Sequence, residues 1–391
     1  MTRRKLISII IASFWMMLLM GTVYAYSIFR TEVKDYYQLS TLASGLPYMF
    51  SLFFYALFMM ITGRVLNDKN LRRYVCIGSL SIITGFLLSS ITSHFIILVI
   101  GYGFFIGSGV GIVYGIPIYI IQRTTSLKKG FLTGLVLLGF GLSPLITAPL
   151  GRLLLISFGL HQTFFVFSMI FIMTQLPLSL LFKIQFDDDE YQKSTLSYQS
   201  LFNLKFISLY VLFIITSAIG LMMIGLSYQV GATYYEFDIH IVTLSLSVFA
   251  ICNGFARPIF GYLIDKFGLF KPSLISLSLI GISAIIGILN QGQHFSIFLI
   301  SYSIFWFNLG AWLSIMPSMI KTYYQQEDYA KVYGAIFTAY GIGAIFSTVI
   351  SGSIIDILGS TSYIYISIMI LMILAFYMLA LFHKQISMHN N

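Results

Sequence analysis

The chain has 391 residues, of which 58% are hydrophobic and only 9% are charged, and its formal net charge is +9. Soluble domains carry about 25% charged residues, so this composition excludes an ordinary soluble enzyme or nucleic-acid-binding domain as the body of the chain. Its two cysteines, Cys76 and Cys252, both lie in apolar segments and form no disulfide or metal-binding pattern.

Runs of 18 or more apolar residues recur from end to end and predict an all-α membrane protein. The first run is followed by no small-residue cleavage site, so we interpret it as a retained span and not as a signal peptide. Twelve transmembrane helices are predicted, near residues 6–28, 42–63, 74–92, 95–121, 131–157, 162–183, 205–230, 239–264, 273–290, 295–320, 332–357 and 361–383. An even number of spans places both chain ends on one side.

The basic residues gather in the loops on the side of the two chain ends, which holds most of the 22 lysines and arginines. The opposite side has only Arg30 and Lys34, offset by Glu32 and Asp35, in what we predict to be a loop. This distribution predicts a multi-pass protein of the plasma membrane with both termini in the cytoplasm. Because the positive charge lies in short loops between spans, a nucleic-acid partner is not expected.

The longest connection, residues 184–204, contains an acidic run and follows the sixth span. We interpret it as a solvated cytoplasmic linker between an N-terminal six-helix bundle, residues 1–183, and a C-terminal six-helix bundle, residues 205–391.

The two halves repeat short motifs about 200 residues apart. The loop motif that starts at Gly63 and contains Asp68 has a counterpart that starts at Gly261 and contains Asp265. The fifth span contains Gly139-Phe-Gly141, and the eleventh contains Gly341-Ile-Gly343. Repeats with the same topology predict two bundles related by a pseudo-twofold axis along the membrane normal.

These loop motifs resemble the cytoplasmic signature of the major facilitator superfamily. In this chain the aspartate of the first copy follows its glycine by five residues, and Asn70 stands where a second glycine is common. The resemblance implies a role in conformational change for Gly63, Asp68 and Asp265.

Within that superfamily the chain is similar to the oxalate/formate antiporter and monocarboxylate porter group. The segments that carry the similarity are Gly21-Thr-Val-Tyr24-Ala-Tyr26 in the first span, Gly107-Ser-Gly109-Val-Gly111 to Pro117 in the fourth, Asn253-Gly-Phe-Ala-Arg257-Pro258 in the eighth, and Asn308-Leu-Gly310 in the tenth. In the fourth span, Gly107 and Gly111 are suited to close helix packing and hinge bending.

Arg257 is the strongest candidate for a substrate-binding residue. A cation at membrane depth costs roughly 2.5–3.5 kcal/mol on insertion scales, so it normally faces a wet cavity or a partner. The family binds its substrate carboxylate with an arginine at the matching position of helix 8. A guanidinium can hold a carboxylate through two parallel hydrogen bonds; the alternative is a structural pairing with a carbonyl or a loop acid.

Oxalate antiporters carry a second cation, a lysine, in helix 11, and here Tyr340 stands at the matching position. One buried cation offsets one carboxylate, whereas a second carboxylate would be left desolvated and unpaired. We therefore expect a monocarboxylate.

Asn253 lies one turn before Arg257 on the same helical face. Animal monocarboxylate transporters have an aspartate there that is thought to carry the proton. An amide cannot titrate, so we expect exchange or facilitated diffusion in preference to proton symport.

Aromatic residues in the spans that line the cavity in this family are further candidates, because a tyrosine hydroxyl can donate to a carboxylate while the ring excludes lipid. Packing in the core or in the membrane interface is the alternative for each. The candidates are Tyr24, Tyr26, Tyr114, Trp306 and Tyr340. Arg152 in the fifth span is expected to reach the outer surface or to pair with Asp356, with an outer anion funnel as the alternative.

The chain contains no Walker A motif, zinc-protease motif, nucleophile elbow or clustered metal ligands. We therefore expect no enzyme activity, no cofactor and no metal. The predicted function is alternating-access transport of a small organic anion by a monomer in the lipid bilayer. The alternatives are an exporter of drugs or other solutes with the same fold, and a membrane sensor that does not transport.

Overall fold

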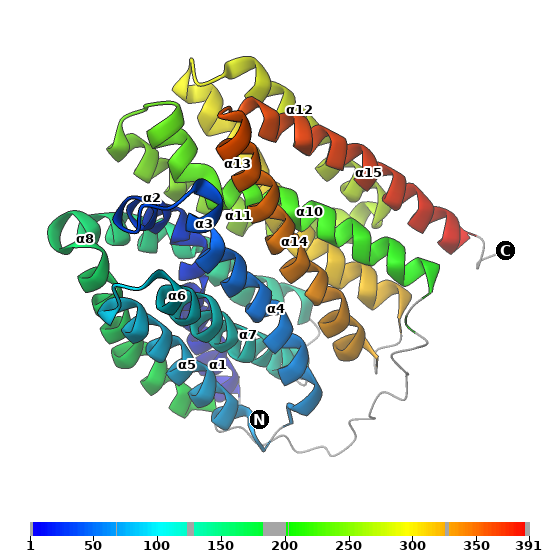
Figure 1. The fold of residues 1–391 in the computed structure, drawn as a ribbon. Helices are drawn as coiled ribbons and strands as arrows, with labels where there is room; N and C mark the ends of the chain where they lie inside the picture. The colour runs from blue at the N-terminus through cyan, green and yellow to red at the C-terminus, as the bar shows by residue number, and fades with distance from the viewer. Residues whose placement is uncertain are drawn as a thin grey trace.

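The fold is given by a computed structural model, which describes residues 3–67, 69–122, 129–182, 201, 203–324 and 328–387. Every regular element within these ranges is helical (Figure 1). We call residues 3–182 the N-terminal half and residues 204–387 the C-terminal half.

The N-terminal half begins with one nearly continuous helical stretch and continues through helices of membrane-spanning length joined by short turns. Its elements are α1 (Arg3–Met20), η1 (Gly21–Ala25), α2 (Tyr26–Tyr36), α3 (Thr41–Ser44), α4 (Leu46–Val65), α5 (Leu71–Ile91), α6 (Phe95–Leu98), the π-helical η2 (Val99–Ile106), α7 (Gly107–Gln122), α8 (Lys129–Ser179) and η3 (Leu180–Phe182).

The 51-residue helix α8 holds two of the predicted spans. A straight helix of that length would extend about 75 Å, far more than the roughly 30 Å of bilayer hydrocarbon. The chain turns back at Gly159, whose φ of 77° and ψ of −178° are not helical and are accessible to a residue without a side chain. The break predicted between residues 157 and 162 is confirmed.

The C-terminal half repeats this pattern of long helices. Its elements are α10 (Leu204–Gln229), the π-helical η4 (Val230–Tyr234), α11 (Ile239–Phe267), α12 (Phe270–Asn290), α13 (Phe295–Tyr323), α14 (Tyr329–Leu358) and α15 (Ser362–Ser387).

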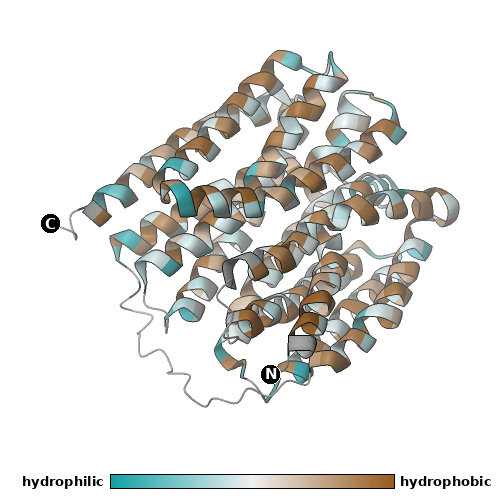
Figure 2. Ribbon diagram, turned by 180° about the vertical axis from the view of Figure 1, so that it is seen from behind, coloured by the Kyte–Doolittle hydropathy of each residue, from teal (hydrophilic) through white to brown (hydrophobic). Residues whose placement is uncertain are grey.

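The described residues form eleven helices long and apolar enough to cross a membrane, and one of these is the doubled α8. The predicted all-α membrane fold of twelve spans in two six-helix bundles is confirmed. Hydrophobic residues cover most of each helix, and hydrophilic residues concentrate near helix ends and turns (Figure 2). The predicted linker, residues 184–204, lies almost wholly outside the described residues.

Two long seams join the halves. Helix α8 packs along α11. Helix α4 packs along α14, and these two helices lie side by side across the centre of Figure 1. Glycines allow both approaches: a Cβ added at Gly141 would lie 2.8 Å from the Cα of Gly254, and one at Gly341 would lie 2.9 Å from Cβ of Ala56. One glycine from each repeated Gly-x-Gly motif therefore lies at a seam between the halves.

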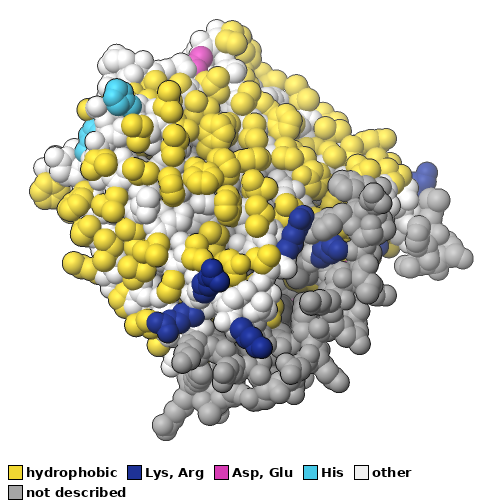
Figure 3. Space-filling model, turned by 60° about the horizontal axis from the view of Figure 1, so that its bottom comes forward, with side chains coloured by type: hydrophobic (Ala, Val, Ile, Leu, Met, Phe, Trp, Pro, Cys, Tyr) yellow, Lys and Arg dark blue, Asp and Glu magenta, His cyan; other side chains and the backbone are white. Residues whose placement is uncertain are grey.

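The two faces of the bundle differ in charge. We call the face with both chain ends the terminal face and the other the distal face. Figure 3 shows a broad hydrophobic surface with lysines and arginines gathered toward one edge and histidine and acidic side chains at the opposite edge. Exposed basic residues of the terminal face are Arg64, Lys69, Arg72, Arg73, Lys266, Lys271, Lys321 and Lys384.

Gly111 and Gly115, one turn apart in α7, provide a matched test of helix packing. A Cβ at Gly111 would clash with the carbonyl oxygen of Tyr55 and lie 3.0 Å from the nitrogen of Met59, whereas a Cβ at Gly115 would meet nothing within 4 Å. We expect Gly111→Ala to destabilise the fold by about 1–3 kcal/mol. Gly115→Ala is expected to be neutral or to stabilise by up to about 1 kcal/mol.

Thermal unfolding of the purified variants in detergent measures this difference. A melting temperature of Gly111→Ala at or above that of Gly115→Ala would contradict the close approach of α7 to α4.

Candidate functional site

Arg257 lies within α11, about 15 Å of helix from its end at the terminal face. The residue is 2% exposed. Its Nη1 donates a hydrogen bond to the carbonyl oxygen of Leu137 in α8, across the seam between the halves. Its Nε and Nη2 donate no hydrogen bond of ordinary geometry within the described part of the chain, and the hydroxyl of Tyr114 is a polar group beside the guanidinium. A buried cation with two free donors is suited to binding an anion that both donors can reach.

Tyrosines from two other spans lie beside this guanidinium, and a third span contributes Tyr340, which contacts Tyr24. Tyr24 of η1 and Tyr114 of α7 both interact with it electrostatically. The hydroxyl oxygens of Tyr24 and Tyr340 are 2.5 Å apart, and this hydrogen bond joins η1 of one half to α14 of the other. Because only one of the two hydroxyl protons occupies that bond, the pair retains one proton for another acceptor.

Aromatic rings close the space around these hydroxyl groups. Tyr55 of α4 packs edge-on against Tyr114 at 5.1 Å between ring centroids and against Phe337 at 5.3 Å, and it stacks on Phe140 at 5.9 Å. All four residues are at most 1% exposed, so the cluster excludes water in this conformation. Tyr55 could not be predicted as part of this cluster, because it is one of many aromatic residues in α4 and no motif distinguishes it.

Asn253 is completely buried one turn before Arg257. Its Nδ2 donates to the carbonyl oxygen of Trp306 at 2.8 Å, and its Oδ1 has no partner within the described residues. The indole Nε1 of Trp306 donates to Oγ of Ser227 at 2.8 Å. Trp306 therefore supports Asn253 from inside the C-terminal half, and its own donor is occupied.

Tyr26 belongs to a second cluster, nearer the distal face. Its hydroxyl donates to the carbonyl oxygen of Ser44 at 2.9 Å, and its ring packs 4.8 Å from that of Tyr102 and 6.0 Å from that of Tyr48. The cation beside it is Arg30. Among the predicted substrate-binding residues, the structure thus brings Tyr24, Tyr114 and Asn253 near Arg257, joins Tyr340 to this group through Tyr24, and groups Tyr26 elsewhere.

Arg30 was predicted to lie in an outer loop, and this is wrong. It lies inside α2 and is 2% exposed, because the first span continues to Tyr36. Its three nitrogens donate to Oγ of Ser44, the carbonyl oxygen of Thr41 and, across the halves, the carbonyl oxygen of Gly225 in α10. Buried carbonyl and hydroxyl acceptors replace the water that a loop would supply.

Asp356 makes a second polar contact between the halves at the distal face. Its carboxylate accepts hydrogen bonds from the backbone nitrogens of Thr41 and Leu42, both at 2.8 Å. The expected pairing of Arg152 with Asp356 is therefore wrong: Arg152 forms an ion pair with Glu32 at 3.1 Å. Together, the Arg30 and Asp356 contacts join the halves near the distal face, and we call these two residues the distal latch.

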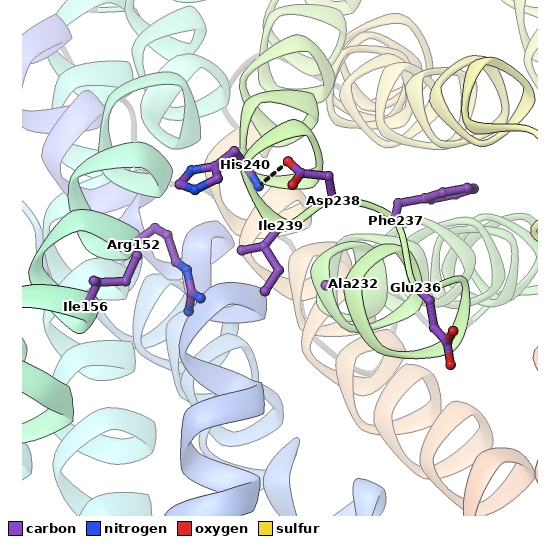
Figure 4. Close-up of a pocket in the computed structure, with 8 residues that line it drawn as sticks. All are labelled: Arg152, Ile156, Ala232, Glu236, Phe237, Asp238, Ile239 and His240. Atoms are coloured by element: carbon purple, nitrogen blue, oxygen red, sulfur yellow. Dashed lines mark hydrogen bonds between the residues drawn. The ribbon is translucent and has the colours of Figure 1, made fainter.

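Arg152 also lines an open pocket of about 470 Å³ between α8 and the start of α11 (Figure 4). Glu236, Asp238 and His240 line the same pocket, and the carboxylate of Asp238 caps the backbone nitrogen of His240. Acidic and basic side chains therefore line the same pocket, whereas tyrosines lie beside Arg257.

The residues predicted to take part in conformational change are placed as follows. Gly107 packs against α4, since a Cβ there would lie 2.7 Å from the Cα of Ser51. A Cβ added at Gly63 would have no atom within 4 Å. Asp265 is exposed at the terminal face. Asp68 lies outside the described residues.

Comparison with known proteins agrees with this architecture. The family model of the Major Facilitator Superfamily matches residues 6–235 and again residues 201–387. The chain is 22% identical over 337 residues to the uncharacterized MFS-type transporter YhjX of Escherichia coli, covering 83% of this chain and 82% of the relative. It is 23% identical over 355 residues to the oxalate:formate antiporter of Oxalobacter formigenes, covering 86% and 82%. The riboflavin transporter MCH5 of Saccharomyces cerevisiae is 25% identical over 118 residues, 30% of this chain and 23% of that protein.

Proposed function

This chain belongs to the Major Facilitator Superfamily, and on that premise we propose that it carries small organic monocarboxylates across the plasma membrane by alternating access. Both termini and the basic terminal face would lie in the cytoplasm. The substrate would bind between the halves, and rocking of the halves about the two seams would expose it to each side in turn. The moving bodies would be residues 1–183 and 205–391, joined by the linker 184–204.

The observation that carries this proposal is the pair of unpartnered donors on buried Arg257. An isolated charge in a medium of low polarity is unfavourable, and a carboxylate that accepts from both Nε and Nη2 would satisfy it. The name of the oxalate:formate antiporter, to which the chain is similar over most of its length, supports an anionic substrate.

A single carboxylate group fits the charge of the site. Arg257 is surrounded by neutral tyrosines, and Tyr340 supplies a hydroxyl group where a second cation would be needed for a dicarboxylate. Arg30 does not supply that second cation in the described structure, because each of its three nitrogens already donates to a protein acceptor.

Counterflow in proteoliposomes tests the proposal. Vesicles that hold the purified protein are loaded with unlabelled formate, acetate, lactate, pyruvate or oxalate, and uptake of the labelled acid is followed. Transient accumulation of monocarboxylates above the level of protein-free vesicles is expected. Uptake of organic cations instead would favour the drug-exporter alternative, and exchange of no solute would favour the sensor.

Coupling to protons is expected to be absent, because Asn253 presents an amide beside Arg257. Asn253→Asp would introduce a titratable acid one turn from the guanidinium. When ionised, this acid would pair with Arg257 and compete with the substrate; when protonated, it would leave Arg257 free. Exchange by the variant should therefore rise as the pH falls, while exchange by the wild type should stay nearly constant.

Initial rates of exchange between pH 5.5 and 8, with the same pH on both sides of the vesicle membrane, measure this effect. Equally flat profiles for both proteins would contradict the placement of Asn253 beside the substrate.

A further inference from the structure

An open pocket lies between the halves at the distal face, and its lining does not include Arg257 (Figure 4). Its volume of about 470 Å³ is within the range of small-molecule sites. One wall consists of Arg152 and Ile156 from α8, and the other consists of Ala232 and residues 236–240. We call it the distal pocket. Because the two walls belong to different halves, a molecule that contacts both walls also joins the halves.

Arg152 brings a cation with unused donors to the first wall. Its Nη1 donates to Oε1 of Glu32 at 3.1 Å, which occupies one of the five N–H donors of the guanidinium. Its Nε has no hydrogen-bond partner within the described residues. The guanidinium also lies over the ring of Tyr228, 5.7 Å from the centroid. The remaining donors are suited to a carboxylate, which can accept two parallel hydrogen bonds from an arginine.

Asp238 brings a carboxylate with an unused oxygen to the second wall. Its Oδ1 accepts hydrogen bonds from the backbone nitrogens of His240 and Ile241 and so caps the start of α11. Its Oδ2 accepts no hydrogen bond from the described part of the chain, and Asp238 forms no ion pair with Arg152. In Figure 4, Asp238 lies across the pocket from Arg152, whereas the side chain of Glu236 points away from them. The free oxygen is suited to an ammonium group.

The charges of the two walls disfavour a ligand that carries a single charge. A simple anion would be attracted by Arg152 but repelled by the carboxylates of Glu32 and Asp238. A simple amine would pair with Asp238 but would be repelled by Arg152 and would leave its donors unused. A zwitterion matches both walls with one small molecule. An apolar side chain on that zwitterion would cover Ile156 and Ile239, which are 63% and 41% exposed.

We propose that the distal pocket is a regulatory site for α-amino acids with an apolar side chain, such as leucine. The carboxylate accepts hydrogen bonds from Arg152, and the ammonium group donates to Oδ2 of Asp238. A ligand that binds only when the two walls are close together shifts the population toward that arrangement. The bound amino acid therefore holds the halves together at the distal face and slows transport. Its binding does not depend on which solute is carried at Arg257.

Displacement of labelled leucine from the purified protein tests the site directly. Two competitors each lack one charge of leucine: isoamylamine has no carboxylate, and isocaproate has no ammonium group. Unlabelled leucine is expected to displace the label about tenfold more effectively than either competitor, because each competitor gives up a charge-assisted hydrogen bond. Equal displacement by either competitor, or no binding of leucine, would overturn the proposal.

Asp238→Asn and Arg152→Gln should each weaken the binding of leucine about tenfold. Asparagine also caps helix N-termini, so Asp238→Asn removes the charge and keeps the start of α11. The matched control is Asp35→Asn, which removes an exposed acid that does not line the pocket, and its affinity for leucine should equal that of the wild type. Unchanged affinity in both pocket variants would refute the site. Should Arg152→Gln fail to fold, Asp238→Asn and the two competitors decide.

Carboxylate counterflow in vesicles with the distal face outward tests the regulation. Leucine added outside should lower the rate, and more carboxylate should not restore it, because the two ligands occupy different sites. Asp238→Asn should relieve the inhibition. Binding of leucine without inhibition, or accumulation of labelled leucine inside the vesicles, would overturn the regulatory role. If no carboxylate is exchanged, the proposed function fails, and displacement of labelled leucine alone decides for or against the distal pocket.

Discussion

Replacement of Arg257 by glutamine is expected to abolish carboxylate exchange, with a loss of at least about 100-fold in transport efficiency. Two charge-assisted hydrogen bonds are each worth roughly 1.5–3 kcal/mol, and every 1.4 kcal/mol is tenfold in affinity. Arg257→Lys keeps the charge but loses the planar fork, so it should retain a small part of the activity. Initial rates of labelled acetate and lactate counterflow measure both variants.

The stability of the same variants separates a binding role from a structural one. Removal of a buried charge that lacks full compensation should leave the melting temperature unchanged or raise it. If Arg257→Gln instead melted well below the wild type, the hydrogen bond to Leu137 would be the main role of the residue. Normal exchange by a folded Arg257→Gln would reject the site.

Replacement of Arg30 by glutamine is expected to open the distal face. Arg30 is the member of the distal latch that reaches from α2 to the carbonyl oxygen of Gly225, and a hydrogen bond from a charged donor is worth about 1.5–3 kcal/mol. Loss of this bond should increase the open population roughly tenfold or more. The variant should also lose net exchange, because the substrate can no longer be enclosed on that side.

A cysteine at position 348 reports on the opening. Thr348 is buried, and its methyl group lies 2.7 Å from the position that a Cβ of Gly45 would occupy across the halves. In a background where Cys76 and Cys252 are serine, Thr348→Cys should react slowly with an impermeant maleimide added from outside, and Arg30→Gln should accelerate the reaction. The matched control is Lys34→Gln, since Lys34 bonds to Thr41 within its own half. Equal labelling rates in all three backgrounds would contradict the latch.

The architecture of membrane spans could be predicted from the sequence, because the length of an apolar run determines whether it forms a span. A span needs about 20 apolar residues, and lipid allows no unpaired backbone groups, so the apolar runs map directly onto helices. The predicted span 95–121 coincides with the observed Phe95–Ile121. The turn at Gly159 was visible as the short gap between two such runs.

The partners of individual side chains could not be predicted in this way. Arg30 was predicted to lie in a loop because the charged residues within four positions of it are typical of loops. In the structure, carbonyl oxygens from α3 and α10 accept hydrogen bonds from its guanidinium inside the protein. Tyr24 and Tyr26 are two residues apart and so point to different sides of the first span, one toward Arg257 and one toward Arg30. Such distinctions depend on residues that are distant in sequence.

The most direct test of the anion site is an experimental structure of the protein determined at a saturating concentration of a monocarboxylate. We predict density for the carboxylate between the halves, with its two oxygens about 2.7–2.9 Å from Nε and Nη2 of Arg257. Density elsewhere, with the guanidinium still donating only to Leu137, would contradict the assignment of Arg257 as the substrate-binding residue.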